Sequence, residues 1–282
     1  MFKILKKEVL NPTVTRMVVS APLVARKAKA GQFIILRVDS EGERIPLTIA
    51  DYDRENGTIT IIFQIVGATT EKLNHLNEGD YICDFAGPLG KPSEVEGFKK
   101  VAVIGGGVGC AIAYPTAKAL AKSGAEVHSI VGFRNRDLVI LEDEFKNVSQ
   151  KLALMTDDGS YGEKGLVTDA LKNLVESGEK YDLVIAIGPL VMMKFVSLLT
   201  KELGIKTVVS MNPVMIDGTG MCGGCRLTVG GEMKFACVDG PDFDGHLVDF
   251  DEAIRRSSIY RETERHKYEE TCNLFKGGNE NA

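Results

Sequence analysis

The segment from Asp217 to Cys237, DGTGMCGGCRLTVGGEMKFAC, holds three of the six cysteines of this chain. Two residues separate Cys222 from Cys225, and a Gly-Gly pair at 230–231 follows between two short strand-like runs. Such a pair between strand-like runs is typical of a β-hairpin. The hairpin would return Cys237 to Cys225, and three converging thiolates suit an iron–sulfur cluster or a zinc ion.

A metal site on these three thiols needs a fourth ligand, and the sequence offers two candidates. Asp217 precedes Cys222 with four residues between them, the spacing of the first two cysteines in plant-type ferredoxins. His246 follows Cys237 and would complete a Cys3His zinc site. Each has a structural alternative, because Asp217 would also suit a turn cap and His246 a place at the surface. The segment favours a metal site but leaves iron–sulfur and zinc both open.

The composition is that of an ordinary folded protein of 282 residues, long enough for two domains and a small appendage. A net charge of −5 without a long basic run argues against a nucleic-acid partner. No apolar run has the length of a signal-peptide core or a membrane span, so we expect no membrane association. Few cysteines, with three at metal spacing, indicate a reducing cytoplasm, and Cys83, Cys110 and Cys272 are expected to be buried or incidental thiols.

Residues 1–97 have the pattern of a small closed β-barrel, with short strand-like runs separated by turns such as Asn56-Gly57 and Gly79-Asp80. One helical stretch is expected at 69–77. The expected strands are Lys3–Val9, Val14–Ala21, Gln32–Val38, Ile45–Ala50, Thr58–Val66 and Tyr81–Phe85.

Two stretches of this barrel suggest ligand binding. Arg44 and Thr48 would point to the same face of a strand, where a guanidinium suits a phosphate and a hydroxyl suits a polar ring atom. The run Gly67-Ala68-Thr69-Thr70 reads as a helix start, with either threonine as N-cap and the helix N-terminus as a phosphate site. Either stretch taken alone is more often structural than functional.

Residues 98–212 alternate apolar strands with helices, a pattern that indicates βαβ units and a parallel sheet. The expected strands are Val101–Ile104, Glu126–Val131, Lys151–Met155, Leu183–Ile187 and Thr207–Ser210. The expected helices are Cys110–Lys122, Leu138–Val148, Lys164–Val175 and Val191–Leu203.

The turn Gly105–Gly109 after the first of these strands indicates a nucleotide site, because it would set backbone N–H groups and a helix N-terminus against a pyrophosphate. It departs from the dinucleotide fingerprint, since Cys110 takes the third glycine position and no acid follows the second strand directly. Arg134 and Arg136 follow that strand instead, where they would suit a 2′-phosphate or lie free in a loop. These residues leave NAD and NADP both open.

The order of these pieces resembles the ferredoxin–NADP reductase superfamily, in the branch of the dihydroorotate dehydrogenase B electron-transfer subunit. It is particularly similar to the small (alpha) subunit family of the electron-bifurcating NADH-dependent reduced ferredoxin:NADP oxidoreductases, the Nfn type. The likeness covers nearly the whole chain. It is carried by Ala30-Gly-Gln-Phe33, Arg44-x-Pro-Leu-Thr48, Gly67-Ala-Thr69, Gly87-Pro-Leu-Gly90, Gly105–Gly109, Ile187-Gly-Pro189 and Asp217-x4-Cys222-x2-Cys225-x11-Cys237-Val-Asp-Gly-Pro241.

The resemblance implies a Greek-key barrel that binds FAD, a nucleotide domain for NAD(H) with NADP(H) not excluded, and a small iron–sulfur module. The ligands implied for a 2Fe–2S cluster are Asp217, Cys222, Cys225 and Cys237. Hydride would pass between nicotinamide and flavin without a catalytic side chain, although many relatives carry a cysteine where this chain has Ile187. The implied cofactor-binding residues are Arg44, Pro46, Leu47, Thr48, Gly67, Ala68, Thr69, Gly87, Gly105, Gly107, Gly109, Arg134, Gly188 and Pro189.

The resemblance also implies domain bounds and a partner. The FAD barrel would span 1–97, the nucleotide domain 98–212, the cluster module 213–246, and a helical tail 247–282 that docks a large flavin and iron–sulfur subunit in a heterodimer. Ile254, Ile259 and Tyr260 would anchor that tail, and ferredoxin would be reached through the partner. The alternatives are a dihydroorotate dehydrogenase B electron-transfer subunit and, from another class, a nucleotide-binding regulator with a Cys3His zinc site.

Overall fold

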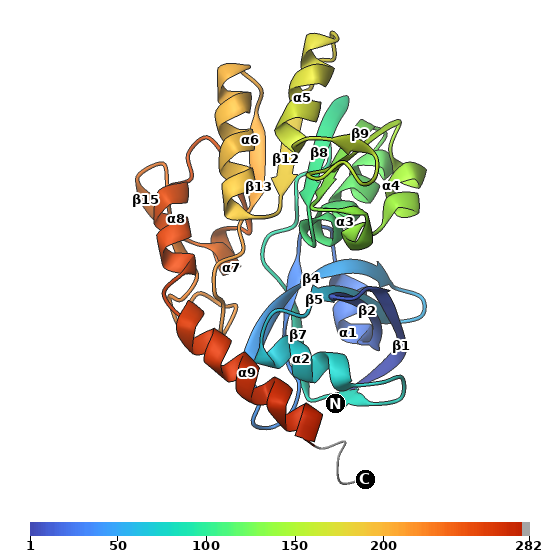
Figure 1. The fold of residues 1–282 in the computed structure, drawn as a ribbon, viewed down its shortest axis with the longest axis vertical. Coiled ribbons are helices and arrows are strands. Elements are labelled where there is room, and N and C mark those ends of the chain that lie inside the picture. The colour runs from blue at the N-terminus through green and yellow to red at the C-terminus, as the bar shows by residue number, and fades with distance from the viewer. Residues whose placement is uncertain (278–282) are drawn as a thin grey trace.

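The computed structural model describes residues 1–277, with the side chains of the last helix described through Cys272. A barrel of strands carries the N-terminus, and a parallel sheet with helices on both faces stands against one end of it (Figure 1). A small C-terminal module lies beside both (Figure 1). This arrangement confirms the expected fold class.

The barrel is a seven-stranded antiparallel sheet in the order β6-β1-β2-β5-β4-β3-β7. Its end strands β6 and β7 are separated in sequence by Cys83 alone, so the two edges meet and the sheet is nearly closed. The strands are β1 (Phe2–Asn11), β2 (Val14–Ser20), β3 (Phe33–Arg37), β4 (Arg44–Asp53), β5 (Thr58–Gln64), β6 (Tyr81–Ile82) and β7 (Asp84–Leu89).

Two short helices contribute to the barrel core. Helix α1 (Pro22–Lys27) begins at a proline and buries Val24 and Ala25, but it is too short for hydrophobic periodicity to reveal it in the sequence. Helix α2 (Ala68–His75) buries Leu73, as its apolar spacing predicts.

The second sheet has five parallel strands in the order β10-β9-β8-β12-β13, with β11 added at one edge and antiparallel β16 at the other. Val101 and Val103 of β8 pack toward α3 and α4, whereas Ala102 and Ile104 pack toward α5 and α6. Both faces are covered, which explains the continuous apolar runs. The elements are β8 (Lys100–Gly106), α3 (Gly109–Lys122), β9 (Glu126–Phe133), η1 (Arg136–Leu138), α4 (Glu142–Val148), β10 (Lys151–Thr156), β11 (Glu163–Lys164), α5 (Val167–Glu176), β12 (Leu183–Ile187), α6 (Leu190–Glu202) and β13 (Thr207–Ser210).

The C-terminal module begins with the hairpin of β14 (Arg226–Val229) and β15 (Glu232–Phe235). Gly230 and Gly231 have φ angles of 61° and 81°, as a two-residue hairpin turn with two left-handed positions requires. A one-turn helix α7 (Ala236–Asp239) follows, and then β16 (Asp242–Asp244), which pairs with β13. The module is therefore bonded to the nucleotide sheet.

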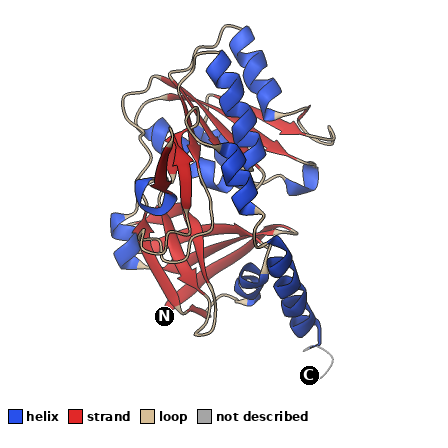
Figure 2. Ribbon diagram, turned by 90° about the vertical axis from the view of Figure 1, so that its left-hand side faces the viewer, coloured by secondary structure: helices blue, strands red, loops and turns tan. Residues whose placement is uncertain are grey.

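The tail of the chain folds into two helices and returns to the barrel. Helix α8 (Phe250–Ser257) starts at Asp249, whose carboxylate accepts the N–H of Glu252, and packs on α6. Helix α9 (Arg261–Gly277) then runs across to α2 of the barrel (Figures 1 and 2). None of the helices in residues 1–277 is both long and apolar enough to cross a bilayer.

Candidate functional site

A cavity of about 1100 Å³ lies between the barrel and the parallel sheet. Gly106 and Gly188 line it at the ends of β8 and β12, and Phe33 and Thr48 line it from the barrel. The connections from β8 and β12 lead to opposite sides of the sheet, and α/β sheets bind ligands at such a point. The cavity is therefore placed where a nucleotide and a barrel-bound group would meet.

Glycines at the end of β8 allow a close approach that any side chain would prevent. Gly107 has a φ of +55°, and a Cβ on Gly109 would lie 2.5 Å from the carbonyl oxygen of Ile187. A Cβ on Gly188 would lie 3.1 Å from the Cα of Gly106. Helix α3 thus starts at the cavity wall, where its positive dipole end favours a phosphate.

Charged side chains line the outer part of the nucleotide side. Arg134 follows β9, Asp157 follows β10, and Lys172 lies on α5. The cations would attract phosphates, and Asp157 would accept hydrogen bonds from ribose hydroxyls. The sequence pattern predicts Arg134 as a nucleotide-binding residue but does not predict Asp157. The position of Asp157, just after the third predicted strand of the parallel sheet, could have indicated it.

Apolar side chains form another part of the wall. Leu166, Val191 and Phe195 line the cavity and are 58%, 52% and 56% exposed. Exposed apolar groups around a cavity suit a flat ring such as adenine. None of the three was predicted from the sequence. Helix α6 carries more apolar residues than one buried face needs, which could have indicated Val191 and Phe195.

The barrel wall of the cavity comes largely from alternate residues of β4. Pro46 and Thr48 line the cavity, whereas Leu47 between them packs toward the barrel core. Arg44 lies on the strand face of Pro46 and Thr48 but is exposed outside the cavity. Asn11, Thr13 and Gln64 also line this side and were not expected from the sequence.

The hairpin brings two of the clustered cysteines into contact. Cys225 Sγ and Cys237 Sγ are 3.2 Å apart and buried, because Arg226 pairs with Phe235 across the hairpin. Burial, together with the neighbouring Cys225 thiol, raises the pKa of Cys237. Cys222 is exposed, and its sulfur accepts the N–H of Gly224 at 3.5 Å. A metal that binds here must displace thiol protons.

Asp217 lies in the same loop as Cys222, whereas His246 lies elsewhere. Asp217 accepts the N–H of Thr219 at 2.9 Å and that of Cys222 at 2.8 Å, and these bonds, the first foremost, lower the pKa of its carboxyl group. His246 is 3.0 Å from the hydroxyl of Thr200 on α6. The structure therefore brings Asp217, and not His246, to the cysteine loop.

Comparisons with known proteins match both modules. The model of the iron–sulfur cluster binding domain of dihydroorotate dehydrogenase B matches residues 212–249, and the oxidoreductase NAD-binding domain matches residues 103–198. A Clostridium beijerinckii protein described as uncharacterized, in the adh 3′ region, is 55% identical over 94% of this chain and 92% of its own. A Thermotoga maritima homologue of the dihydroorotate dehydrogenase B electron transfer subunit is 48% identical, over 95% of this chain and 94% of its own.

A solved structure extends the similarity to the whole fold. A chain of the NADH-dependent reduced ferredoxin-NADP oxidoreductase is 46% identical, with a TM-score of 0.90, over 96% of this chain and 97% of that chain. This chain belongs to the family of dihydroorotate dehydrogenase B-type electron-transfer subunits.

Membership of this family confirms the expected class of protein. The chain is the Nfn-type subunit of an NAD(P)H-dependent flavin and iron–sulfur oxidoreductase, with FAD, a 2Fe–2S cluster and NAD(H) as the expected groups. Relatives in the family are electron-transfer subunits, so this chain works with a larger partner. The alternative of a zinc-bearing regulator is wrong, because residues 212–249 match an iron–sulfur domain.

The residues present fit these groups. Three thiols and an ionised carboxylate form a donor set for iron, and the left-handed φ angles of Gly218, Gly220 and Gly223 let their loop curl around a centre. On the nucleotide side, Gly106 and Gly188 lie close together and line the cavity. Because neither has a side chain, their backbone is accessible to a bound nucleotide.

Several residues expected to bind cofactors lie outside the cavity. Gly67 is the N-cap of α2, and the Thr70 hydroxyl accepts the N–H groups of Val66 and Gly67, so neither Thr69 nor Thr70 is the N-cap. Ala68 and Thr69 form the first turn of α2, and Thr69 is buried. Gly87 packs against Ile34, and Gly105 packs against Cys110, whose burial raises its thiol pKa. Arg44 and Leu47 also lie outside the cavity, so binding by Arg44, Leu47, Gly67, Ala68, Thr69, Gly87 and Gly105 stays a prediction.

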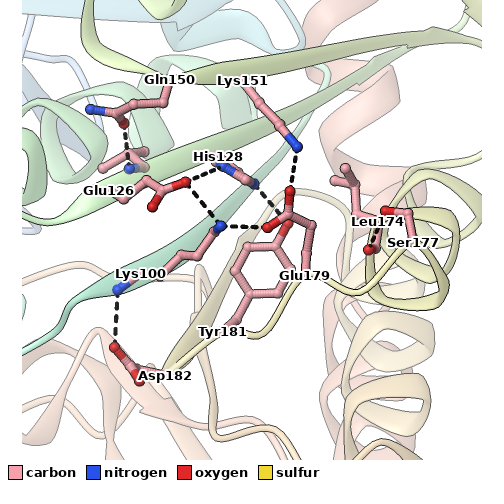
Figure 3. Close-up of polar contacts among 11 residues, drawn as sticks. Lys100, Glu126, His128, Gln150, Lys151, Leu174, Ser177, Glu179, Tyr181 and Asp182 are labelled. Carbon is pink, nitrogen blue, oxygen red and sulfur yellow. Dashed lines mark hydrogen bonds and ion pairs between the residues drawn. The ribbon is translucent and has the colours of Figure 1, made fainter.

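A second polar cluster lies at the amino ends of the parallel strands, the sheet edge away from the cavity (Figure 3). His128 is buried between the Tyr181 hydroxyl and Glu126, each 2.9 Å away. The ammonium of Lys100 pairs with Glu126 and Glu179. Ligand atoms of Glu126, His128 and Glu179 lie within 4.8 Å of one another, but Lys100 and Lys151 already neutralise the two carboxylates, so the cluster is structural.

Proposed function

We propose that this subunit accepts hydride from NADH at the cavity and passes electrons singly, through the cysteine module, to a larger partner of the Nfn type. One observation carries the proposal: Pro241, four residues after Cys237, lines the cavity. The module with the cysteines thus forms part of the wall at which hydride would be received. Bound FAD and a 2Fe–2S cluster would supply the conversion of a hydride pair into single electrons.

The nucleotide side binds and orients NADH. The N-terminus of α3 at Gly107 and Gly109 receives the pyrophosphate, and Gly188 and Pro189 leave room for the nicotinamide. Arg134 adds positive charge near the phosphates. Asp157 and Leu166 hold the adenosine through its ribose hydroxyls and its ring. These residues act by orientation, and no side chain serves as acid or base.

The barrel side holds the flavin. The hydroxyl of Thr48 donates to a polar atom of the ring, and Pro46 supports the ring beside it. Arg44, on the same strand face farther out, pairs with the pyrophosphate. At the start of α2, Gly67 leaves room for the same phosphates, and the backbone N–H groups of Ala68 and Thr69 point to them.

The cluster ligands are Asp217, Cys222, Cys225 and Cys237. Cys225 and Cys237, whose sulfurs are in contact, would hold the cluster from one side, and Asp217 with Cys222, whose backbone N–H it accepts, would hold it from the loop. A carboxylate is a harder ligand than a thiolate, so the two irons would differ electronically.

The partner docks around the exposed edge of the cysteine loop. Val214, Ile216 and Met221 are 46%, 50% and 88% exposed there, and large apolar side chains exposed close together in the sequence are typical of an interface. Ile259 and Tyr260, exposed between α8 and α9, extend it. The partner is a large flavin and iron–sulfur subunit through which ferredoxin is reached, and the pair performs electron bifurcation. The free cysteines fit a cytoplasmic location.

A dihydroorotate dehydrogenase B subunit is the related second candidate, favoured by the names of several relatives. Asp217 at the first ligand position argues against it. Activity assays of the purified native complex distinguish the two candidate functions. Reduction of NADP by reduced ferredoxin and NADH supports the Nfn type, whereas oxidation of dihydroorotate supports the alternative.

The primary test is the visible spectrum of the anaerobic protein before and after NADH. Flavin bands and a broad iron–sulfur absorption that both bleach with NADH support the proposal. Bleaching by NADPH alone overturns the nucleotide assignment, and a colourless protein overturns the function. Cys225→Ser serves as the matched variant, because it should lose the iron–sulfur absorption but keep flavin bleaching by NADH.

A further inference from the structure

The carboxyl group of Asp242, whose Oδ1 atom is buried, connects three parts of the molecule beside the cavity. Ser93, in the segment between barrel and nucleotide domain, donates its hydroxyl to Asp242 Oδ2 at 2.5 Å. Ser210, at the end of β13, is the partner of Asp242 in the β13–β16 strand pairing, and its side chain lowers the pKa of the carboxyl group. Asp242 itself lies on β16, the strand that follows the last cysteine of the cluster module.

The backbone beside Asp242 makes the same connections as its side chain. The N–H of Lys91 donates to the carbonyl of Gly240 at 2.7 Å, and the N–H of Met211 donates to that of Pro241 at 2.9 Å. A Cβ on Gly31, whose φ is +82°, would lie 2.1 Å from the Ser93 hydroxyl. The glycine of the Ala30-Gly-Gln-Phe33 motif therefore makes room for this contact.

The surroundings favour the neutral acid. Burial raises the pKa of Asp242, and the two serine hydroxyls offset the shift only in part. Asp242 Oδ1 is buried and has no hydrogen-bond partner among the described residues, which would be costly for a carboxylate. Of the charged residues on the same segments, Glu94 pairs with Lys206, and neither Lys91 nor Asp244 contributes to the pKa of Asp242.

We propose that Asp242 is a positioning residue, which as a neutral acid holds the cluster module against the cavity wall. Its carboxyl group bonds Ser93 in the segment that follows the barrel, and its backbone pairs with Ser210, which lines the cavity. Pro241 beside it lines the cavity, and Cys237 lies five residues earlier. The position of the cysteines relative to the cavity, and with it the rate at which electrons reach them, depends on this contact. The inference rests on the proposed function.

Rapid mixing of the cofactor-loaded protein with NADH tests this by following flavin bleaching and cluster bleaching separately. Asp242→Asn, neutral and of the same shape, should leave both rates within about twofold of wild type. Asp242→Ala should slow cluster bleaching by about tenfold or more while flavin bleaching changes little, because small displacements have large rate effects. Asp244→Asn, on the same strand but exposed, should change neither rate. Flavin and iron content confirm that each variant is loaded.

Equal slowing of both steps by Asp242→Ala, or slowing of cluster bleaching by Asp242→Asn, would overturn the proposal. The protonation is tested without turnover, by the infrared band of a carboxylic acid that is present in the wild type at pH 7 and absent from Asp242→Asn. If no such band is present, the neutral-acid assignment is wrong. If the wild type shows the band but NADH does not bleach its flavin, the proposed function fails and not the protonation.

Discussion

Asp217 is the residue whose chemistry most distinguishes the cysteine loop, because as a proposed ligand it would set an oxygen where a thiolate would complete a four-cysteine site. Asp217→Cys should still assemble a cluster, with a changed reduction potential and visible spectrum, because a soft thiolate replaces a hard donor. Asp217→Ala should weaken metal binding by about tenfold or more. Iron content and a redox titration measure both effects. An unchanged potential and spectrum in Asp217→Cys would remove Asp217 from the ligand set.

Asp157 offers a second test at the scale of a single side chain. Its carboxylate suits a ribose diol but repels a 2′-phosphate, so Asp157→Asn should lower the KM for NADPH by about tenfold and raise that for NADH. Steady-state rates of flavin reduction with both nucleotides measure the ratio. Asp158→Asn is the matched control, because that carboxylate is bonded to Ser160 in its own loop. A ratio unchanged in Asp157→Asn would place the ribose elsewhere.

At the scale of elements, the buried His128 and the ion pairs around it fasten the amino ends of the parallel strands (Figure 3). Burial lowers the pKa of His128, so its ring is neutral and the charges of Lys100 and Lys151 balance those of Glu126 and Glu179. Removing one of these charges leaves its oppositely charged partner uncompensated. The resulting loss of stability should be larger than that from breaking an exposed surface pair.

Hydrogen bonds from Lys100 and Lys151 lower the pKa of Glu179 to about 2 from an ordinary 4.5. Because the folded-state pKa is the lower one, the stability from this carboxylate is fully present above pH 4.5 and is lost as the pH falls toward 2. Glu179→Gln should therefore lower the Tm at pH 7, and the difference should shrink below pH 4.5. Glu176→Gln, in an exposed pair with Lys172, should change little. A Tm difference independent of pH would contradict this account.

Elements defined by local sequence were predictable, and those defined by distant contacts were not. The β14–β15 hairpin follows from Gly230 and Gly231, whose left-handed backbone sets the turn, and the approach of Cys237 to Cys225 follows from it. Strand β16 is only three residues long and exists because β13 offers an edge to pair with. No local pattern marks such a strand.

The same division holds for the candidate site. Spacing singled out Asp217 and also His246, and only the fold shows that Thr200 holds His246 away from the cysteines. Of Arg44 and Thr48, which strand alternation places on one face, only Thr48 lines the cavity. Asp157 and Leu166 reach it because separate strands of one sheet end at the same edge, a relation between segments that no single stretch of sequence records.

At the scale of the whole molecule, two ion pairs as well as a shared apolar cluster join the barrel to the nucleotide domain. Arg16 on β2 pairs with Glu144 on α4 at 2.5 Å, and Lys118 on α3 pairs with Asp51 on β4 at 2.6 Å. The side chains are partly exposed, so each pair contributes only about 0.5 kcal/mol to stability. Their larger effect would be on alignment, because the cavity has one wall in each domain.

Replacing Arg16 and Lys118 together by Met should slow flavin bleaching by NADH severalfold, because hydride transfer depends on the alignment of the two walls. The Tm should change little, since both pairs are partly exposed. Added salt should slow the wild type toward the rate of the double variant, because screening weakens such pairs. The swapped pair Lys118→Asp with Asp51→Lys serves as control and should restore much of the rate lost in Lys118→Met. A double variant as fast as wild type at low salt would mean that apolar packing alone aligns the two walls.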